Sequence, residues 1–578
     1  MREDDLTRAG PFQNVTRTTL KTAPTTLPTD QASVDEIIAY HDRSKHHLDH
    51  YARGPGGLDW ANQPNPFRSF ADSPVLRLPL AARDDTPPAS ALFGVVQVAP
   101  RPFNLETIGL FFELSLGLSA RKEIPGSSWF LRVNPSSGNL HPTEAYAVLP
   151  ALEYLPGGAG VYHYSSVQHA LEQRARWPQK AQPDTAGFHV GLTSVTWREA
   201  WKYGERAFRY CQHDAGHALA ALRFAAAVLG WRVQWLPGWG DTQLAKLLGL
   251  DRTEDFTDAE RETPELLVRV CACAAGAPAL PSSEYASIEW FGRANRLSQS
   301  QLAWPAITAA IGASERVAAS INAIESVAPA IWPPPSPPAS ALTAGQLIRQ
   351  RRSAVDFDGH TTIALETFLA ILDSTLPRPA SPLFDAWPFA ARLHLVLFVH
   401  RVTALAPGLY LWLRAAVDQQ LLQQAFRAGF DWETPPNLPW LAPLYQLGKG
   451  DVRDFARDLS CGQDIASDSA FSLGMLAHFE PVLRERGAGA YRELFWEAGM
   501  LGQVLYLAAE AAGVRGTGIG CYLDDVLHRA LGLANHDWQS LYHFTIGGPV
   551  EDSRLRTVGP YAHLEGQKSS GSSPAVSA

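Results

Sequence analysis

Two stretches of the sequence are copies of each other, and this internal repeat limits the possible folds more than any other feature. Phe208–Leu250 aligns without a gap with Tyr491–Leu533, and about three aligned positions in ten are identical. The identical pairs include Arg209/Arg492, Gly216/Gly499 and Asp241/Asp524. Because chance and shared helix composition would give only a few identities, we infer two copies of one fold that form a pseudo-dimer within one chain.

The chain is long enough for two large domains. Its 578 residues exceed what one hydrophobic core organises. The run Trp332–Pro338, WPPPSPP, predicts an extended and stiff spacer. We expect a flexible N-terminal arm at 1–33, a first domain at 34–300, an Ala/Ser/Pro-rich linker at 301–340, a second domain at 341–562 and a disordered tail at 563–578.

Composition and charge narrow the class of protein. The net charge of −9 and the pI of about 6.1 predict no nucleic-acid partner. Neither a secretory signal nor a membrane-spanning apolar stretch is found, so we expect a cytoplasmic protein without a membrane segment. The five cysteines are scattered, which predicts neither a disulfide framework nor a zinc site, and the histidines of Tyr40–Phe70 lack the spacing of metal ligands. We therefore expect no metal.

The sequence predicts a helix near its N-terminal end and a long helix in the first half. A cap at Ser33 predicts that the first helix begins there. A single long helix is predicted from about Arg198 to Leu229, and its face of small residues predicts a place at the centre of a domain contact. His213 and His217 lie one turn apart on this helix and, with Asp214, are expected to form hydrogen bonds at that contact.

The stretch Leu131–Tyr146, LRVNPSSGNLHPTEAY, contains a turn suited to a planar cofactor with a polar edge. It combines a residue that restricts φ, two hydroxyl groups and a residue that permits a tight turn, namely Pro135, Ser136, Ser137 and Gly138. The amide of Asn139 donates and accepts at once, which matches a ring edge with both C=O and N–H groups. A flavin has such an edge.

The run Pro135–Pro142, PSSGNLHP, resembles the Pro-Ser-x-x-Asn-x-Gln-Pro turn of FMN-dependent nitroreductase-fold enzymes, with His141 in place of the usual Gln. With Arg132 before it and Glu144–Tyr146 after it, the stretch is similar to that of the SagB-type dehydrogenase branch. This resemblance implies a tandem pair of nitroreductase-like α+β domains with FMN at their interface. It covers nearly all of residues 35–560.

Enzymes of this family bind FMN across a two-fold interface, and the second half of the chain has the parts that hold the phosphate. Arg351, Arg352 and Ser353 resemble the family's Arg/Ser motif. Arg554 stands in the position of the terminal phosphate ligand. Guanidinium groups suit a phosphate because they form bidentate, charge-assisted hydrogen bonds.

The second half also has Thr517–Cys521, TGIGC, where the family passes backbone N–H groups along the flavin edge, so Gly520 and Cys521 are candidate flavin contacts. It lacks the Pro-Ser-x-x-Asn turn. The first half has that turn but only a weak counterpart of the phosphate motif, Arg43–Lys45. We therefore expect one composite FMN site built from both halves.

Lys202 and Tyr203 resemble the Lys-Tyr motif of SagB-type dehydrogenases, whose pair is assigned to proton removal as a heterocycle is oxidised. A Lys made neutral by burial, or a Tyr poised by an adjacent cation, can act as a base. A lysine that extends toward solvent beside a packed tyrosine is the structural alternative. Both interpretations remain open from the sequence.

The resemblance predicts an FMN-dependent oxidoreductase, a dehydrogenase acting on azoline heterocycles in a peptide or on a similar small-molecule substrate, with a peptide-modifying complex as a possible setting. One alternative is an NAD(P)H-dependent reductase of nitro compounds or quinones, which needs no dedicated base. The other is a degenerate flavin-fold scaffold subunit, which predicts no stable flavin.

Overall fold

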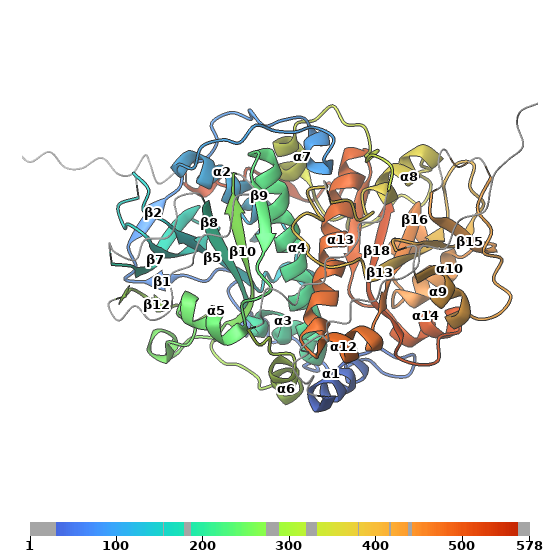
Figure 1. Ribbon diagram of the computed structural model, residues 1–578, viewed down its shortest axis with the longest axis horizontal. Coiled ribbons are helices and arrows are strands. Elements are labelled where there is room, and N and C mark those ends of the chain that lie inside the picture. The colour runs from blue at the N-terminus through green and yellow to red at the C-terminus, as the bar shows by residue number, and fades with distance from the viewer. Residues whose placement is uncertain are drawn as a thin grey trace, which may run out of the picture.

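The computed structural model describes residues 31–153, 155–178, 187–272, 288–318, 332–379, 381–415, 418–436, 438 and 442–564. Within these residues the chain forms two α+β halves side by side, each with its own antiparallel sheet (Figure 1). The tandem arrangement predicted from the repeat and the α+β fold implied by the resemblance are therefore confirmed.

The first half is built on a large sheet with helices against it. Its strands are β1 (Phe70–Ala71), β2 (Val75–Arg77), β5 (Thr143–Leu149), β6 (Gly160–Ser165), β7 (Ala170–Arg176), β8 (Gly187–Ser194), β9 (Arg232–Trp235), β10 (Thr263–Cys271), β11 (Glu289–Trp290) and β12 (Arg293–Ala294). Its helices are α2 (Leu105–Ser115), α3 (Thr196–Tyr203), α4 (Ala207–Val228), α5 (Asp241–Leu248) and α6 (Pro305–Ala313). The sheet order is β11-β7-β6-β5-β8-β10-β9, with β2 on β7, while β1 and β12 pair separately.

The second half repeats this plan with a smaller sheet. Its strands are β13 (Leu393–Val399), β14 (Gly408–Trp412), β15 (Leu444–Lys449), β16 (Phe471–His478), β17 (Arg515–Ile519) and β18 (Trp538–Gly547). Its helices are α7 (Ala344–Gln350), α8 (Leu365–Asp373), α9 (Gln419–Ala425), α10 (Arg453–Leu459), α11 (Asp464–Asp468), α12 (Glu480–Arg486), α13 (Ala490–Ala511) and α14 (Asp524–Leu531). The sheet order is β15-β14-β13-β16-β18-β17.

The two halves meet through α4 and α13, which lie side by side at the centre of the molecule (Figure 1). Each helix has 22 residues and is buried along almost its whole length. A Cβ at Gly216 would lie 2.2 Å from the carbonyl oxygen of Trp496, and one at Gly499 would lie 2.2 Å from that of His213. The two glycines thus allow the helix backbones to touch.

Other identities of the repeat form a reciprocal pair of ion pairs across the same interface. Arg209 of the first half donates to Asp524 of the second at 2.6 Å, and Arg492 of the second half pairs with Asp241 of the first. All four residues are buried. The repeated residues therefore match because they perform the same contact twice, once from each half.

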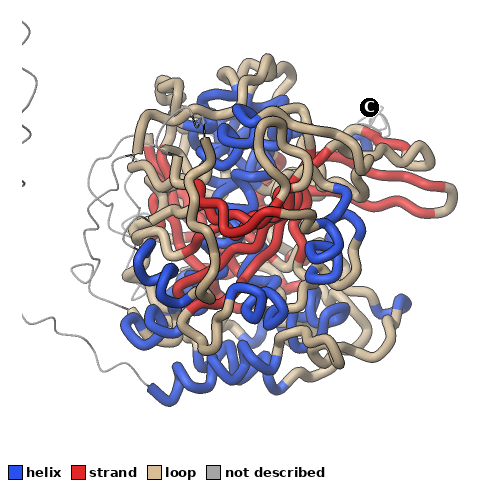
Figure 2. The backbone as a smooth tube through the Cα atoms, turned by 90° about the vertical axis from the view of Figure 1, so that its right-hand side faces the viewer, coloured by secondary structure: helices blue, strands red, loops and turns tan. Residues whose placement is uncertain are grey.

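Each half also extends a segment over the other. The helix α1 (Gln31–Arg43) packs on the second half, where the His41 ring lies 4.4 Å from that of Phe479. In the opposite direction, the late strand β19 (Arg556–Val558) joins β3 (Leu118–Ile124) and β4 (Ser127–Arg132) of the first half in a three-stranded sheet. This sheet extends from the body of the molecule beside the C-terminal end (Figure 2).

The long helix predicted from Arg198 to Leu229 is wrong as one helix. It is divided at Gly204, which has a φ of +54°, and a Cβ there would lie 2.3 Å from the carbonyl oxygen of Arg53. Only glycine fits this backbone and this approach. The helix α3 therefore ends at Tyr203 and α4 begins at Ala207.

Three boundaries also differ from the predictions. The first helix begins at Gln31, before the predicted cap at Ser33. The helix α6 lies inside the predicted linker, because Pro305 suits a first helical turn and an alanine-rich run follows it. His563 bonds the carbonyl of Val167 at 2.8 Å, so the start of the predicted tail is ordered. Residues 1–30, 319–331 and 565–578 lie outside the described residues.

Among the helices of the described residues, none combines the length and apolar character needed to cross a membrane.

Replacing Gly499 with Ala is expected to destabilise the protein. The added methyl group overlaps the His213 carbonyl oxygen, so α4 and α13 must move apart, and we expect a loss of about 1–3 kcal/mol in the free energy of unfolding. Urea unfolding measures this loss.

Gly312→Ala is the matched control for Gly499→Ala. Gly312 lies in α6, and no atom stands within 4 Å of the added Cβ. Because Ala favours a helix over Gly, we expect this control to gain roughly 0.5–1 kcal/mol. Equal stability of Gly499→Ala and the wild type would contradict the close helix approach.

Candidate functional site

The predicted cofactor turn lies between β4 and β5 and has an unusual backbone. Gly138, Asn139 and His141 all have positive φ, of +60°, +59° and +51°. Glycine adopts this left-handed region freely, and Asn and His are among the residues that tolerate it. Ser136 stabilises the turn, because its Oγ accepts the His141 N–H at 2.8 Å.

The amide of Asn139 is already used within the turn. Its Nδ2 donates to the Phe130 carbonyl at 2.9 Å, and its Oδ1 lies 2.8 Å from His141 Nε2. Burial lowers the pKa of His141 well below its ordinary value, so the ring is neutral and Nε2–H is the donor. His141 thus orients Asn139, and one donor and one acceptor of the predicted flavin contact are occupied.

Lys202 and Tyr203, far from the turn in sequence, lie directly against it. A Cβ at Gly138 would stand 2.6 Å from Tyr203 Oη and 3.0 Å from Lys202 Nζ. Both residues end α3, which Arg198 anchors by donating to the His141 carbonyl at 2.7 Å. The fold therefore brings the Lys-Tyr pair and the turn into one site.

Tyr203 is a proton donor in this site. Burial, followed by the nearby Glu199, raises the pKa of Tyr203 well above its ordinary value. This direction of the shift favours the protonated phenol, although Lys202 Nζ lies 5.2 Å from its ring centroid. The amine of Lys202 is the candidate base of the pair.

Two buried carboxyl groups behind the turn were not predicted as part of the site. Asp214 Oδ1 accepts the Ser137 N–H at 3.4 Å, and Glu199 lies in α3 ahead of Lys202. Burial raises the pKa of Asp214 to about 7, and burial together with Asp214 raises that of Glu199 well above its ordinary value. Perturbed carboxyls of this kind are typical of functional sites.

The sequence carried little signal for this pair. Asp214 was expected at the contact between the halves, where its neighbours His213 and His217 do bond the Leu541 carbonyl at 3.0 Å and Gln503 at 3.1 Å. Those two expectations are confirmed, but Asp214 faces the turn instead. Its electrostatic interaction with Glu199 depends on how α3 docks, which no spacing in the sequence reveals.

Arg351 reaches from the second half to the strand before the turn. Its Nε donates to the Val133 carbonyl and its Nη2 to that of Arg132, both at 3.1 Å. Nη1 is buried without a hydrogen-bond partner in the described residues, and no ion pair joins Arg351 to a carboxylate there. Burial lowers the pKa of Arg351, as desolvation does for a cation, while the nearby Glu510 acts in the opposite direction.

Ser353 is exposed and contacts the same tyrosine, Tyr506, as Arg351 does. Its Oγ is 2.9 Å from the hydroxyl of Tyr506, which also accepts the Gly518 N–H at 2.9 Å. Arg351 lies over the same tyrosine, 5.0 Å from the ring centroid. Arg351 and Ser353 therefore remain together as candidate anion contacts.

Three other predicted arginines are occupied elsewhere. Arg352 donates to three carbonyl oxygens, including that of Ser119 at 2.9 Å. Arg132 is buried and donates to the Pro66 carbonyl at 2.7 Å. The side chain of Arg554 is 84% exposed and bonds Asp552, because that carboxylate lies two residues away and competes for the guanidinium.

The weak phosphate motif of the first half is also used for another contact. Lys45 Nζ pairs with Asp525 of the second half at 3.1 Å, and Arg43 bonds Glu205 at 2.7 Å. These residues tie the loop after α1 to the rest of the protein. They supply no second anion site.

Gly520 connects the loop of the second half to the Lys-Tyr pair. A Cβ there would lie 2.4 Å from the Tyr210 ring, and its carbonyl accepts the Tyr210 hydroxyl at 3.0 Å. The Tyr210 ring in turn lies 4.6 Å from that of Tyr203. Cys521, the next residue, is half-buried. Tyr210 thus links Gly520 of the second half to Tyr203 of the first half.

Comparison with known proteins agrees with this arrangement. The model of the nitroreductase family matches residues 118–259 and 348–548, one region in each half. A solved structure from Anabaena variabilis, described as a nitroreductase, has 23% identity and a TM-score of 0.63, over 89% of this chain and 99% of that one. This likeness supports the fold.

Two other solved structures align over one part of the chain. A Ralstonia eutropha protein described as a nitroreductase has 18% identity and a TM-score of 0.26, over 37% of this chain and 95% of that one. A chain of the E. coli microcin synthetase McbBCD complex with truncated pro-MccB17 bound has 18% identity and a TM-score of 0.26, over 43% and 95%. No curated protein matches the sequence.

Asp214→Asn is expected to flatten the pH dependence of stability. A carboxyl whose pKa is raised in the folded state stabilises the fold below its unfolded pKa of roughly 4, and this contribution is lost as the pH rises toward the folded value. That value is about 7 for Asp214. We therefore expect the variant to be more stable than the wild type at alkaline pH, by about 1–3 kcal/mol.

Urea unfolding at a series of pH values measures this difference. The control is Asp454→Asn, because the Asp454 side chain is 90% exposed. A wild-type pH profile retained in Asp214→Asn would show that Asp214 does not hold its proton in the folded protein.

Proposed function

The chain belongs to the nitroreductase family, and from this premise we propose that it is an FMN-dependent dehydrogenase of the SagB type, which oxidises azoline heterocycles in a peptide or a similar substrate. The family supports an oxidoreductase, and its members generally bind FMN. The observation that carries the finer proposal is the contact of Lys202 and Tyr203 with Gly138 of the turn.

The residues at the interface fit FMN at both of its ends. At one end, the buried and unpaired Nη1 of Arg351 and the exposed hydroxyl of Ser353 suit a phosphate. At the other end, the backbone of Gly138 is exposed, which allows a flat ring to approach the turn, while Gly520 is half-buried against Tyr210. Arg352, Arg132 and Arg554 are left out of the proposed contacts because other groups occupy them.

The chemistry divides between the cofactor and the chain. Bound FMN supplies an acceptor for the hydride that leaves the heterocycle. The amine of Lys202 takes the proton from the adjacent substrate carbon, and Tyr203 donates a hydrogen bond that orients the ring. Asp214 and Glu199, behind the turn, place carboxyl groups near Lys202 that can share the proton it takes up.

Replacing Lys202 with Ala is expected to abolish dehydrogenation while flavin-dependent reduction of a quinone survives. Loss of a general base costs about 10²–10⁴-fold in rate, whereas quinone reduction requires only an accessible flavin. Turnover of an azoline peptide and of a quinone with NAD(P)H measures the two activities. Lys246→Ala, an exposed lysine in α5, is the control.

The same assay separates the alternatives. Dehydrogenation that persists without Lys202 would contradict its role as the base. Quinone reduction without any azoline oxidation in the wild type would favour the reductase.

FMN counted per chain tests the composite site directly. We expect one FMN per chain in the wild type and about tenfold to hundredfold weaker FMN binding in Arg351→Met, because a charge-assisted hydrogen bond to the phosphate is lost. Arg554→Ala should bind FMN as the wild type does, since Arg554 is exposed and paired with Asp552. Quenching of flavin fluorescence measures the affinities. A wild type that holds no FMN after reconstitution would favour the scaffold.

A further inference from the structure

Two cysteines of the second half come together at the interface, although they are 60 positions apart. The Sγ atoms of Cys461 and Cys521 are 2.7 Å apart, and both residues are half-buried. In contrast, Cys211 and Cys271 are buried apart from this pair. Cys461 and Cys521 are far apart in the sequence but are neighbours in the fold, because the segments after α10 and β17 converge.

The surrounding residues shift the pKa values of the two thiols in opposite directions. His46 hydrogen-bonds Cys521, and its Nδ1 accepts a backbone N–H at 3.0 Å, which leaves the proton of the neutral ring on Nε2. Arg206 is held beside them, with its Nε donating to the Gly520 carbonyl at 3.2 Å. Hydrogen bonds from Cys461 and His46, with the charge of Arg206, lower the pKa of Cys521 to about 5 against the effect of burial.

Cys461 has the opposite tendency. Its hydrogen bond to Cys521, together with burial, raises its pKa. One thiol of the pair is thus ionised and the other keeps its proton, which is the division of an attacking and a resolving cysteine.

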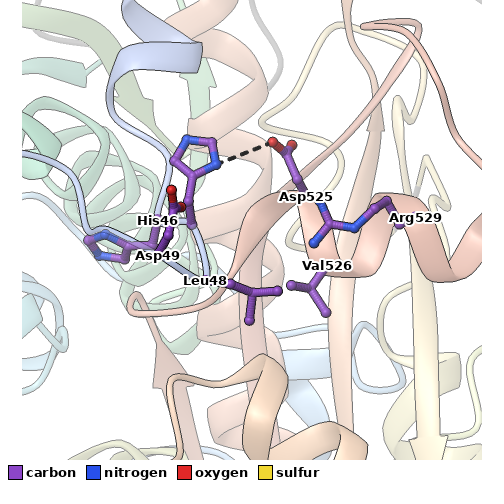
Figure 3. Close-up of a pocket in the computed structure, with 7 residues that line it drawn as sticks. His46, Leu48, Asp49, Asp525, Val526 and Arg529 are labelled. Carbon is purple, nitrogen blue, oxygen red and sulfur yellow. Dashed lines mark ion pairs between the residues drawn. The ribbon is translucent and has the colours of Figure 1, made fainter.

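A cavity of about 240 Å³ lies between the loop after α1 and the helix α14 (Figure 3). His46, which bonds Cys521, also lines the cavity, and Asp525 and Arg529 supply opposite charges at its wall. His47 Nδ1 lies 3.6 Å from Asp525. The volume and the mixed charges suit a small zwitterionic molecule.

A metal site would be the other interpretation of a cysteine and histidine cluster. Within the described ranges, no group of three or more His, Cys, Asp or Glu side chains is arranged to hold a metal ion. The ligand geometry of the cluster therefore favours sulfur chemistry.

We propose that Cys461 and Cys521 are a redox-active dithiol that reduces a low-molecular-weight disulfide. The Cys521 thiolate attacks one sulfur of that disulfide, forms a mixed disulfide and releases the first small thiol. Cys461 then loses its proton and attacks Cys521 Sγ, which releases the second small thiol and leaves an intramolecular disulfide. Two protein thiols are oxidised and one external disulfide is reduced. This activity does not depend on the proposed flavin chemistry.

Oxidised glutathione added to the reduced full-length protein tests the proposal, with peptide mass mapping to locate each product. In the wild type we expect the Cys461–Cys521 disulfide and no lasting adduct. Cys461→Ser should retain one glutathione on Cys521, because the resolving thiol is missing. Cys521→Ser should form neither product at a comparable rate, because burial still raises the pKa of the remaining Cys461 thiol. The buried Cys211 and Cys271 serve as internal controls.

The rate of the first step gives a second measurement. In the Cys461→Ser variant at about pH 6, Cys521 should react with oxidised glutathione on the order of tenfold faster than a free cysteine thiol does. The larger ionised fraction of Cys521 outweighs the lower nucleophilicity of a low-pKa thiolate. A rate no greater than that of free cysteine, or a wild type that accumulates a stable glutathione adduct without the intramolecular disulfide, would overturn the proposal. Circular dichroism confirms that both variants are folded.

Discussion

The contact between Gly216 and Gly499 is the constraint on which the other arrangements depend. Because the backbones of α4 and α13 touch there, every element that follows or precedes these helices is held at a fixed distance from the other half. Arg351 can then reach the carbonyls before the turn, and Tyr210 can reach Gly520. The buried ion pairs of Arg209 and Arg492 keep the same register at the ends of the contact.

The site that results concentrates ionisable groups in the interior. Arg351 is a buried cation with a free donor, whereas Asp214 and Glu199 are buried carboxyls whose pKa values are raised. Each of these groups would be more stable in water. The α4–α13 contact and the exchanged segments stabilise the rest of the fold, and a negatively charged ligand would complete the balance at Arg351.

The sequence was most informative where a structural feature depends on residues that follow one another in the chain or recur in both halves. The repeat predicted the two halves, because the same residues perform the same interface contact twice. The turn at Pro135–Asn139 was recognisable since its backbone demands particular residue types at consecutive positions. Arginine was a poor guide, because any nearby carbonyl or carboxylate can occupy a guanidinium, as Asp552 does for Arg554. The interactions of Glu199 with Asp214 and of Cys461 with Cys521 form only when distant segments dock, so no local sequence pattern predicts them.

Joining the two halves in one chain removes a restriction that binds a symmetric dimer. In a homodimer every substitution appears at both equivalent sites, so neither can change without the other. Here the repeat positions that correspond to Lys202 and Tyr203 are Glu485 and Arg486, and Arg486 packs 3.6 Å over the Phe389 ring and bonds Glu493 at 2.6 Å. One copy of the interface thus makes structural contacts while the other keeps the candidate reactive groups, an asymmetry that a homodimer cannot have.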